Sequence, residues 1–332
     1  MATNSDYFVR WFKDGDLEYY MFHLNNSLYN QYDEERFQWK FQQSPYKLDI
    51  VPIAMVEERK TGKSVGFNSF LPLEIKTGNT IIPIVQGCDG YIERDHRRKG
   101  LFQKTIHFMT EYFSDNGPEL LLGFNFVESL GAAKKAGSIS SALINRWLFK
   151  PNQIEIGLDP VSDLSLIHIN HRRVHDIYQK SSQEQVIHLH RSQEYLDWRF
   201  NQSPLRDYIL FEYQMGDLIG YIVVSSIADE EGKMELSIDD YFPVFTDANL
   251  FFTILRSILK KFQCIEVVEL YTRNNDVLDR ALFQICLEKD KDPRYTLIMK
   301  SIKKGVSGDQ TLRVGVNLFN NEEWHITKSD IY

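Results

Sequence analysis

The chain has 332 residues, a length that favours two domains over one. Hydrophobic residues make up 43% and charged residues 25%, which is typical of a folded globular protein and excludes disordered, collagen-like and coiled-coil chains. The net charge of −8 excludes a large basic face for duplex nucleic acid. There is no pattern of a signal peptide or membrane span, and three cysteines form no disulfide framework, so we expect a cytoplasmic protein.

One segment occurs twice in the chain. Its copies are Phe37–Lys47 and Leu196–Arg206, which share Trp, Phe, Gln, Ser and Pro in register. In each case a glycine turn leading into an apolar strand follows, at residues 61–67 and 215–221. Two repeated features in the same order predict an ancient duplication that gave two similar domains.

The predicted domains are residues 1–157 and 158–332, which meet near the turn-rich segment 158–163. In the first domain, strands are predicted at 7–12, 50–57, 64–73, 80–92 and 119–125, and helices from residue 16 and at 34–41, 103–113 and 128–136. This alternation indicates an α/β fold in which helices flank a mixed central β-sheet.

Positive charge is concentrated in the loop after the strand that ends at Ile92. Between Arg94 and Lys104, five Arg and Lys residues stand against one Asp. A helix that begins at Leu101 presents unpaired N–H groups, and Gly100 permits a close backbone approach or a positive φ. The loop therefore predicts an anion site, above all for a phosphate; a solvated turn that caps a helix is the alternative.

This strand, loop and helix resemble the acetyl-coenzyme A (acetyl-CoA) site of the GNAT acyltransferase superfamily. The family fingerprint is Arg or Gln, two residues, Gly, one residue, then Gly or Ala, and it is similar to Arg97–Phe102 here, with Phe102 in the last position. A tandem bacterial branch of the superfamily tolerates phenylalanine there. The segment around Trp39 and the ending 323–330 also resemble that branch.

The resemblance implies two tandem GNAT-like domains, of which the first holds acetyl-CoA as co-substrate and needs no metal. The pantetheine arm of the coenzyme would pair with the strand that ends at Ile92, where a backbone N–H would polarise the thioester oxygen. The pyrophosphate would lie at the fingerprint loop. The residues expected to bind it are Arg97, Arg98, Lys99, Gly100, Leu101 and Phe102.

Direct attack of an amine on a thioester requires a base, an oxyanion donor and an acid. Strand alternation places Asp89, Tyr91 and Glu93 on one face beside the expected thioester. We therefore expect Asp89 to be the base, with Glu93 next and Glu128 weaker. Alternatively, the strand carboxylates are solvated edge residues.

The family's usual residues on the following strand and helix are only partly present. Asn125 ends the strand where the family often has Asn, although it equally fits a strand-end cap. Ala132 and Ala133 stand where the family has a tyrosine as general acid. Tyr91 or water would then protonate the thiolate, or acyl transfer is slow or absent.

The second domain lacks the features of a coenzyme site. No glycine occurs between Gly232 and Gly305, and the loop 241–249, which corresponds to the basic loop, contains no Arg or Lys. We expect this degenerate copy to serve as scaffold and as one wall of an acceptor site at the junction of the copies.

Two other groups of residues are interpreted as structural. The histidines His168, His171 and His175 lack a metal-ligand spacing and fit a surface helix. The tryptophans Trp11, Trp39 and Trp198 are expected in the core, where they would anchor the helices of each copy to its sheet.

The resulting hypothesis is an N-acetyltransferase that transfers an acetyl group to a primary amine of a small molecule, such as an amino sugar or amino acid. The alternatives are a non-catalytic acyl-CoA binding module and a Fem-type aminoacyl transferase, which the acidic balance disfavours. The expected partner is the amine acceptor, with no nucleic acid and no membrane. The chain is expected to be a monomer or a homodimer.

Overall fold

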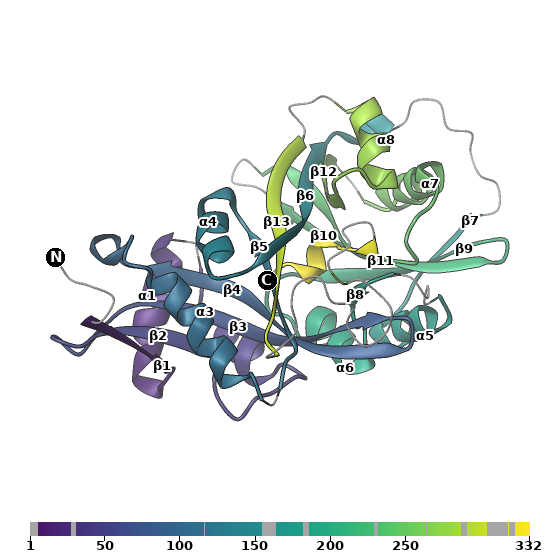
Figure 1. The fold of residues 1–332 in the computed structure, drawn as a ribbon. Coiled ribbons are helices and arrows are strands. Elements are labelled where there is room, and N and C mark those ends of the chain that lie inside the picture. Colours follow the sequence, from purple (N-terminus) through teal and green to yellow (C-terminus); the bar gives the residue numbers. More distant parts are fainter. Residues whose placement is uncertain are drawn as a thin grey trace.

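The computed structural model describes residues 6–27, 31–115, 117–154, 164–181, 186–228, 232–262, 264–286, 291–303, 318 and 323–332. Helices lie on both faces of a mixed β-sheet, which confirms the predicted α/β class (Figure 1). Within these ranges, every helix is too short or too polar to cross a membrane. The predicted junction at 158–163 lies outside the described residues.

The first half of the chain contains the predicted elements, with ends shifted by a few residues. They are β1 (Tyr7–Trp11), α1 (Leu17–Ser27), α2 (Glu34–Phe37), β2 (Ile53–Glu58), β3 (Lys63–Thr77), β4 (Thr80–Ile92), α3 (Leu101–Tyr112), β5 (Leu120–Asn125) and α4 (Val127–Lys135). A further strand that was not predicted, β6 (Ile139–Phe149), follows them. The helix predicted to end at 41 continues beyond α2 as a π-helical turn, Gln38–Gln42.

The second half repeats this order. Its elements are β7 (Leu164–His168), α5 (His171–Ser181), α6 (Gln193–Leu196), β9 (Tyr208–Met215), β10 (Leu218–Ala228), β11 (Met234–Phe242), α7 (Ala248–Leu259), β12 (Ile265–Arg273), α8 (Val277–Ile285) and β13 (Lys291–Ser301). A two-residue strand, β8 (His188–Leu189), is added and pairs with β3. Both halves thus run strand, two helices, three strands, helix, strand, helix, strand.

The strands of the two halves join into one sheet. Its order is β1-β2-β3-β4-β5-β13-β6-β12-β11-β10-β9-β7, which reads the same from either end when each strand is matched to its counterpart. The last strand of each half is exchanged: β13 pairs with β5, β6 pairs with β12, and β13 and β6 pair at the centre (Figure 1). Two separate sheets were expected from the sequence, but backbone hydrogen bonds connect them here.

The repeated tryptophans meet where the halves pack together. The rings of Trp39 and Trp198 stack at 4.7 Å and 14°, and each indole N–H donates to the other residue's backbone carbonyl, at 2.9 and 2.8 Å. Both belong to the central core cluster. They are buried as predicted, but the interpretation that each anchors its own helix to its own sheet was incomplete, because each packs on the other copy.

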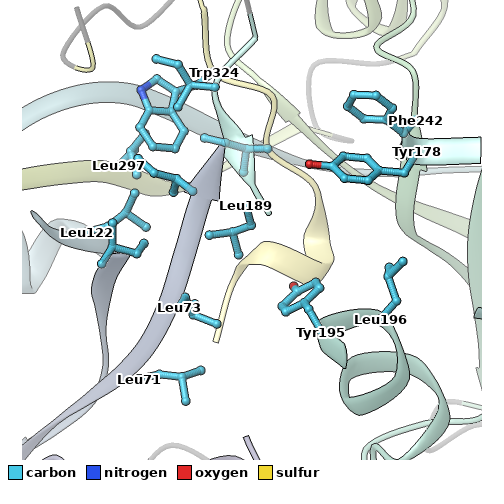
Figure 2. Packing of buried hydrophobic residues seen from close by; sticks show 14 of the residues in the cluster. Leu71, Leu73, Leu122, Tyr178, Leu189, Tyr195, Leu196, Phe242, Leu297 and Trp324 are labelled. Carbon is cyan, nitrogen blue, oxygen red and sulfur yellow. The ribbon is translucent and has the colours of Figure 1, made fainter. Parts of the chain in front are cut away.

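This core cluster is shared by the two halves. Figure 2 shows Leu73 and Leu122 from the first half together with Tyr178, Leu196 and Trp324 from the second. Burying large apolar side chains is the main favourable term in folding, so the interface between the halves contributes as a domain core does.

Candidate active site

Strands β4 and β5 separate from each other toward their carboxyl ends. They pair in parallel from Ile84 opposite Leu120 to Gly87 opposite Gly123, and this pairing does not extend farther toward their carboxyl ends. A cavity of about 640 Å³ lies at the opening. That volume is in the range of small-molecule sites in proteins.

Both halves of the chain line this cavity. The first half contributes residues 87–90 of β4, 123–125 of β5 and Ala133 of α4. The second half contributes Arg199, which follows Trp198, and Tyr295 of β13. The sequence analysis assigned no role to either residue, although Arg199 is the basic residue after the second repeated tryptophan, as Lys40 is after the first.

Asp89 is a cavity residue that is almost completely buried. Its Oδ2 accepts hydrogen bonds from the Lys40 ammonium at 2.7 Å and from the Tyr20 hydroxyl at 2.9 Å. The side chains of Asp89 and Lys40 are 2% and 4% exposed. Burial by itself lowers the pKa of Lys40, but the Asp89 charge outweighs it, so the pKa lies above its ordinary value. Both partners of Asp89 favour its ionised form.

Tyr91 and Glu93 lie on the same side of β4 as Asp89, and all three contact α1. Tyr91 stacks on His23 at 4.4 Å, and Glu93 accepts a hydrogen bond from the Tyr19 hydroxyl at 2.9 Å. Burial lowers the pKa of His23, and the Glu93 charge opposes that shift. Neither Tyr91 nor Glu93 is among the described residues that line the cavity, whereas Asp89 is.

The basic loop has the backbone geometry of an anion site. Gly100 is the N-cap of α3 with φ of 73°, and Arg98 also has a positive φ, 62°. Among the described residues, the backbone N–H groups of 98–102 find no hydrogen-bond acceptor. These donors at the start of a twelve-residue helix, beside the exposed side chain of Arg98, form an arrangement that attracts phosphate.

Two other cations of the loop already have protein partners. The Arg97 Nε donates to the carbonyl of Ile92 at 2.8 Å, and the Lys99 ammonium donates to the Tyr7 hydroxyl at 2.8 Å. Ile92 packs in the small apolar cluster around Tyr7 and is not one of the described cavity residues. The cavity is lined by the preceding part of β4, residues 87–90.

Phe102 differs from the family's small residue, and its surroundings explain how it fits. A Cβ added at Gly90 would lie 3.0 Å from the Phe102 ring. The ring therefore occupies space that a side chain on β4 would otherwise take. Phe102 also lines the cavity, close to where β4 leaves β5.

The structure places Asn125 at the end of β5, as expected, and shows which residue stands where the family has a tyrosine. Asn125 lines the cavity, and its Nδ2 donates to Ser129 Oγ at 2.9 Å, which ties the end of β5 to α4. Ala133 is buried and faces the cavity without a hydroxyl. Tyr295 brings a phenol to the same cavity, and within the described part of the chain its hydroxyl has no hydrogen-bond partner.

The corresponding region of the second half is filled with aromatic side chains. Tyr241 of β11, Phe245 of the loop and Phe251 of α7 pack on one another. Asp247 is the N-cap of α7 and accepts from the Asn249 N–H. A carboxylate occupies the helix N-terminus where the first half has Gly100, and it would repel a phosphate.

The histidines interpreted as structural form no metal site. His171 and His175 lie on α5, as expected, but His168 is the last residue of β7 and not part of a helix. His171 is 3.4 Å from a carboxylate oxygen of Asp197. Across the described ranges, no three His, Cys, Asp or Glu side chains come together in a way that would hold a metal ion.

No protein-family model and no curated protein sequence matches the chain. Solved structures do match it. A GCN5-related N-acetyltransferase from Anabaena variabilis superposes with a TM-score of 0.65 at 14% identity, over 89% of this chain and 73% of that chain. Saccharomyces cerevisiae N-myristoyltransferase, solved with bound myristoyl-CoA, superposes with a TM-score of 0.57 at 13% identity, over 96% and 87%.

The chain has the GNAT fold. A probable N-acyltransferase from Enterococcus faecalis shares it, with a TM-score of 0.62 at 11% identity, over 90% of this chain and 72% of that chain. At these identities the likeness establishes the fold, and the GNAT fold fits the separation of β4 from β5 and the position of α3. Function has to be argued from the site.

Proposed function

We propose that the chain is an N-acyltransferase that transfers an acetyl group from acetyl-CoA to a primary amine of a small molecule. The observation that carries this proposal is the cavity where β4 separates from β5, next to a helix N-terminus with unpaired N–H donors. A yeast protein of the same fold was solved with bound myristoyl-CoA, which supports an acyl-CoA as co-substrate.

In this proposal the coenzyme is held at two places. The N–H groups of 98–102 and the Arg98 side chain bind the pyrophosphate, because helix N-termini and guanidinium groups both favour phosphate. The pantetheine arm follows β4 past residues 87–90, and the thioester reaches the cavity. The acetyl group is thereby placed beside groups from both halves.

The chemistry follows from the groups that line the cavity. The amine nitrogen attacks the thioester carbon, the C–S bond breaks, and the amine loses one proton while the thiolate gains one. Asp89 is the carboxylate among the described lining residues, so we assign it as base, with Glu93 as the alternative. We assign Tyr295, rather than Tyr91, as the acid, because Tyr295 is among the described residues that line the cavity and Tyr91 is not.

A second candidate function is supported by Ala133. Ala133 lines the cavity in the region where the family resemblance implies a tyrosine as general acid, so a domain that binds acyl-CoA without turning it over is the alternative. Thiolates are good leaving groups, and missing acid catalysis therefore slows the reaction without preventing it. Thiol release in the presence of amines separates the two functions.

Calorimetry with acetyl-CoA tests the coenzyme site. We expect one molecule bound per chain and at least tenfold weaker binding in Gly100→Val, because a β-branched residue is strained at a φ of 73°. Gly62→Val is the matched control, since Gly62 has a φ of 68° and its added Cβ meets nothing within 4 Å. Two molecules per chain, or equal affinity in the two variants, would contradict the proposal.

A further inference from the structure

Arg199 is a buried cation in the cavity wall that pairs with no carboxylate side chain in the described part of the chain. It is 4% exposed and follows Trp198 in the repeated segment, in the position that Lys40 holds after Trp39. Lys40 has the Asp89 carboxylate at 2.7 Å. Among the described residues, Arg199 forms no ion pair with any carboxylate.

The contacts of Arg199 are all with uncharged groups. Its Nη1 donates to the Tyr208 hydroxyl at 2.7 Å, its Nε donates to the Ser329 carbonyl at 3.2 Å, and its guanidinium lies 5.2 Å from the centre of the Tyr332 ring. Its Nη2 has no hydrogen-bond acceptor in the described part of the chain. The buried Asp239 interacts electrostatically with Arg199, but no hydrogen bond or ion pair is found between these two described side chains.

The whole cavity carries an excess of positive charge. Among the described side chains that line it, the charged ones are Arg36, Lys40, Arg199 and Arg294 against Asp89. This excess stands out in a chain of net charge −8. Arg294 differs from Arg199, because its side chain is 41% exposed and pairs with Asp292 at 3.4 Å. A buried cation without an anion is costly, so a binding site that contains one favours an anionic ligand.

We propose that the acceptor amine also bears a carboxylate, as amino acids do, and that Arg199 binds this carboxylate. The identity of the ligand as an acyl acceptor rests on the proposed function. The anion site itself is argued only from the contacts and burial of Arg199. A guanidinium with a free Nη2 offers a charge-assisted hydrogen bond to a carboxylate. Polycationic amino sugars would instead meet repulsion from the cavity.

Acceptor pairs that differ only in the carboxylate test the inference. With saturating acetyl-CoA, thiol release is measured for α-amino acids, for the matching decarboxylated amines and for the matching amino alcohols. We expect kcat/KM to be at least tenfold higher for the amino acids. Arg199→Gln should lower kcat/KM ten- to hundredfold for amino acids and little for the amines, the usual effect of losing a charged hydrogen bond.

Further variants keep the test decisive if Arg199→Gln folds poorly. Arg199→Lys retains the charge and should keep part of the preference for amino acids. Arg173→Gln is the control, because Arg173 is 39% exposed and pairs with Glu212 outside the described cavity lining. It should leave the preference unchanged. Equal rates with amino acids and amines in the unmodified protein, or an unchanged preference in Arg199→Gln, would overturn the inference.

Failure of the proposed function gives a different result. In that case acetyl-CoA neither binds nor releases thiol, and the anion site is tested by thermal shift with amino acids and their decarboxylated amines. Stabilisation by the amino acids alone that is lost in Arg199→Gln would still support an anion site. No difference between acids and amines would overturn it.

Discussion

The pair of Asp89 and Lys40 shows how a single buried contact links stability and chemistry. The two side chains lie 2.7 Å apart and are almost inaccessible to solvent. Such a pair is maintained only while both members are present, since an unpaired buried charge is strongly unfavourable. Lys40 also fixes the position of the Asp89 carboxylate in the cavity wall, where the proposed function assigns it as base.

Asp89→Asn should therefore have two separable effects. We expect the free energy of unfolding to fall by about 3–5 kcal/mol, because Lys40 loses its counter-ion inside the protein. We expect turnover to fall by about 10² or more if Asp89 is the base, with little change in acetyl-CoA affinity. Denaturant unfolding, calorimetry and thiol release measure the three quantities.

The double variant Asp89→Asn/Lys40→Met separates these effects. Removing both charges should restore part of the lost stability, because no unpaired charge remains. Turnover should stay low, since the base is still missing. Turnover close to that of the unmodified protein in either variant would move the role of base to Glu93, which lies farther along the same side of β4.

At the scale of elements, the two repeated glycines set how closely neighbouring strands approach. Gly66 lies on β3 and Gly220 on β10, at corresponding positions of the two repeats. A Cβ added at Gly66 would lie 2.6 Å from the Tyr91 carbonyl oxygen, and one added at Gly220 would lie 2.7 Å from the Phe242 carbonyl oxygen. These are backbone atoms, so a change of side-chain rotamer cannot relieve the overlap.

Gly66→Ala and Gly220→Ala should each lower the free energy of unfolding by about 1–3 kcal/mol, the usual cost of overpacking. Gly87→Ala on β4 is the matched control, because its added Cβ would meet no atom closer than 3.7 Å. Its effect should stay within about 0.5 kcal/mol, as for substitutions without a structural conflict. Equal effects in all three variants, measured by urea unfolding, would contradict this account.

At the scale of the whole molecule, the exchanged strands make the halves interdependent. β13 from the end of the chain lies between β5 and β6 of the first half (Figure 1). Without it, β5 would expose an unpaired edge and the central core cluster would lose one side. Exposed strand edges and apolar surfaces promote aggregation.

Residues 1–157 expressed alone should therefore be insoluble or poorly folded. A full-length chain that is cut after Asp163, at an introduced protease site, should behave differently, because both pieces have already paired. We expect the two fragments to elute together in gel filtration. A stable, monomeric fragment 1–157 with full acetyl-CoA affinity would show instead that the halves are independent.

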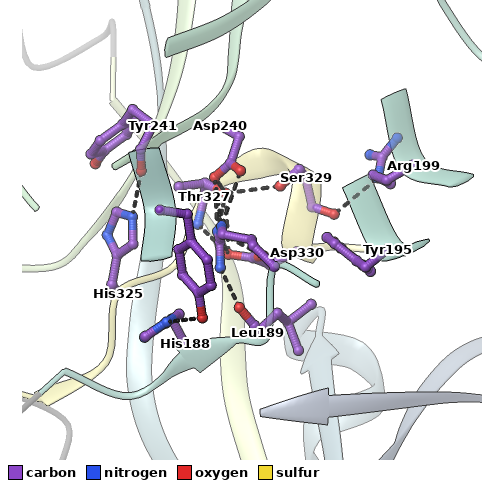
Figure 3. A network of polar contacts seen from close by, with 12 residues as sticks. His188, Leu189, Tyr195, Arg199, Asp240, Tyr241, His325, Thr327, Ser329 and Asp330 are labelled. Atoms are coloured by element: carbon purple, nitrogen blue, oxygen red, sulfur yellow. Dashed lines mark hydrogen bonds and ion pairs between the residues drawn. The ribbon is translucent and has the colours of Figure 1, made fainter. Parts of the chain in front are cut away.

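The end of the chain is fixed to the second half by a buried polar network. Figure 3 shows Asp240, Thr327 and Asp330 in this network, where Arg191 donates to both carboxylates at 2.8 and 3.2 Å. His325 lies beside it and donates through Nε2 to the Tyr241 carbonyl at 2.9 Å. Burial, together with the Arg191 charge, lowers the pKa of His325 to about 4.

This shift predicts an acid-sensitive stability. The pKa of His325 in the folded state is below that of an unfolded histidine, near 6.5, so protons bind the unfolded state first. The contribution of the neutral His325 to the free energy of unfolding is complete above pH 6.5. It is lost as the pH falls toward 4, by about 3 kcal/mol in total. His325→Gln should reduce the slope of the unfolding free energy against pH over this range, while the buried His188, whose pKa burial also lowers, keeps its own contribution. His107→Gln, at an exposed position on α3, should leave the pH dependence unchanged.

The sequence by itself determined the features that depend on neighbouring residues. The strand predicted at 80–92 is β4, the helix after Gly100 is α3, and the predicted cap and turn glycines have positive φ. Asp89, Tyr91 and Glu93 share one side of their strand, as period-two alternation requires. Periodicity, capping and turn chemistry are local, so they can be read along the chain.

The tertiary structure alone decided which distant residues meet. Lys40 pairs with Asp89, Trp39 stacks on Trp198, and β13 inserts beside β5. The repeated basic residue after each tryptophan was the one sequence signal for Lys40 and Arg199, but nothing in it shows that only the first has a carboxylate partner. Such contacts depend on how two halves pack and exchange strands, and pairings between segments so far apart leave no period or spacing along the chain.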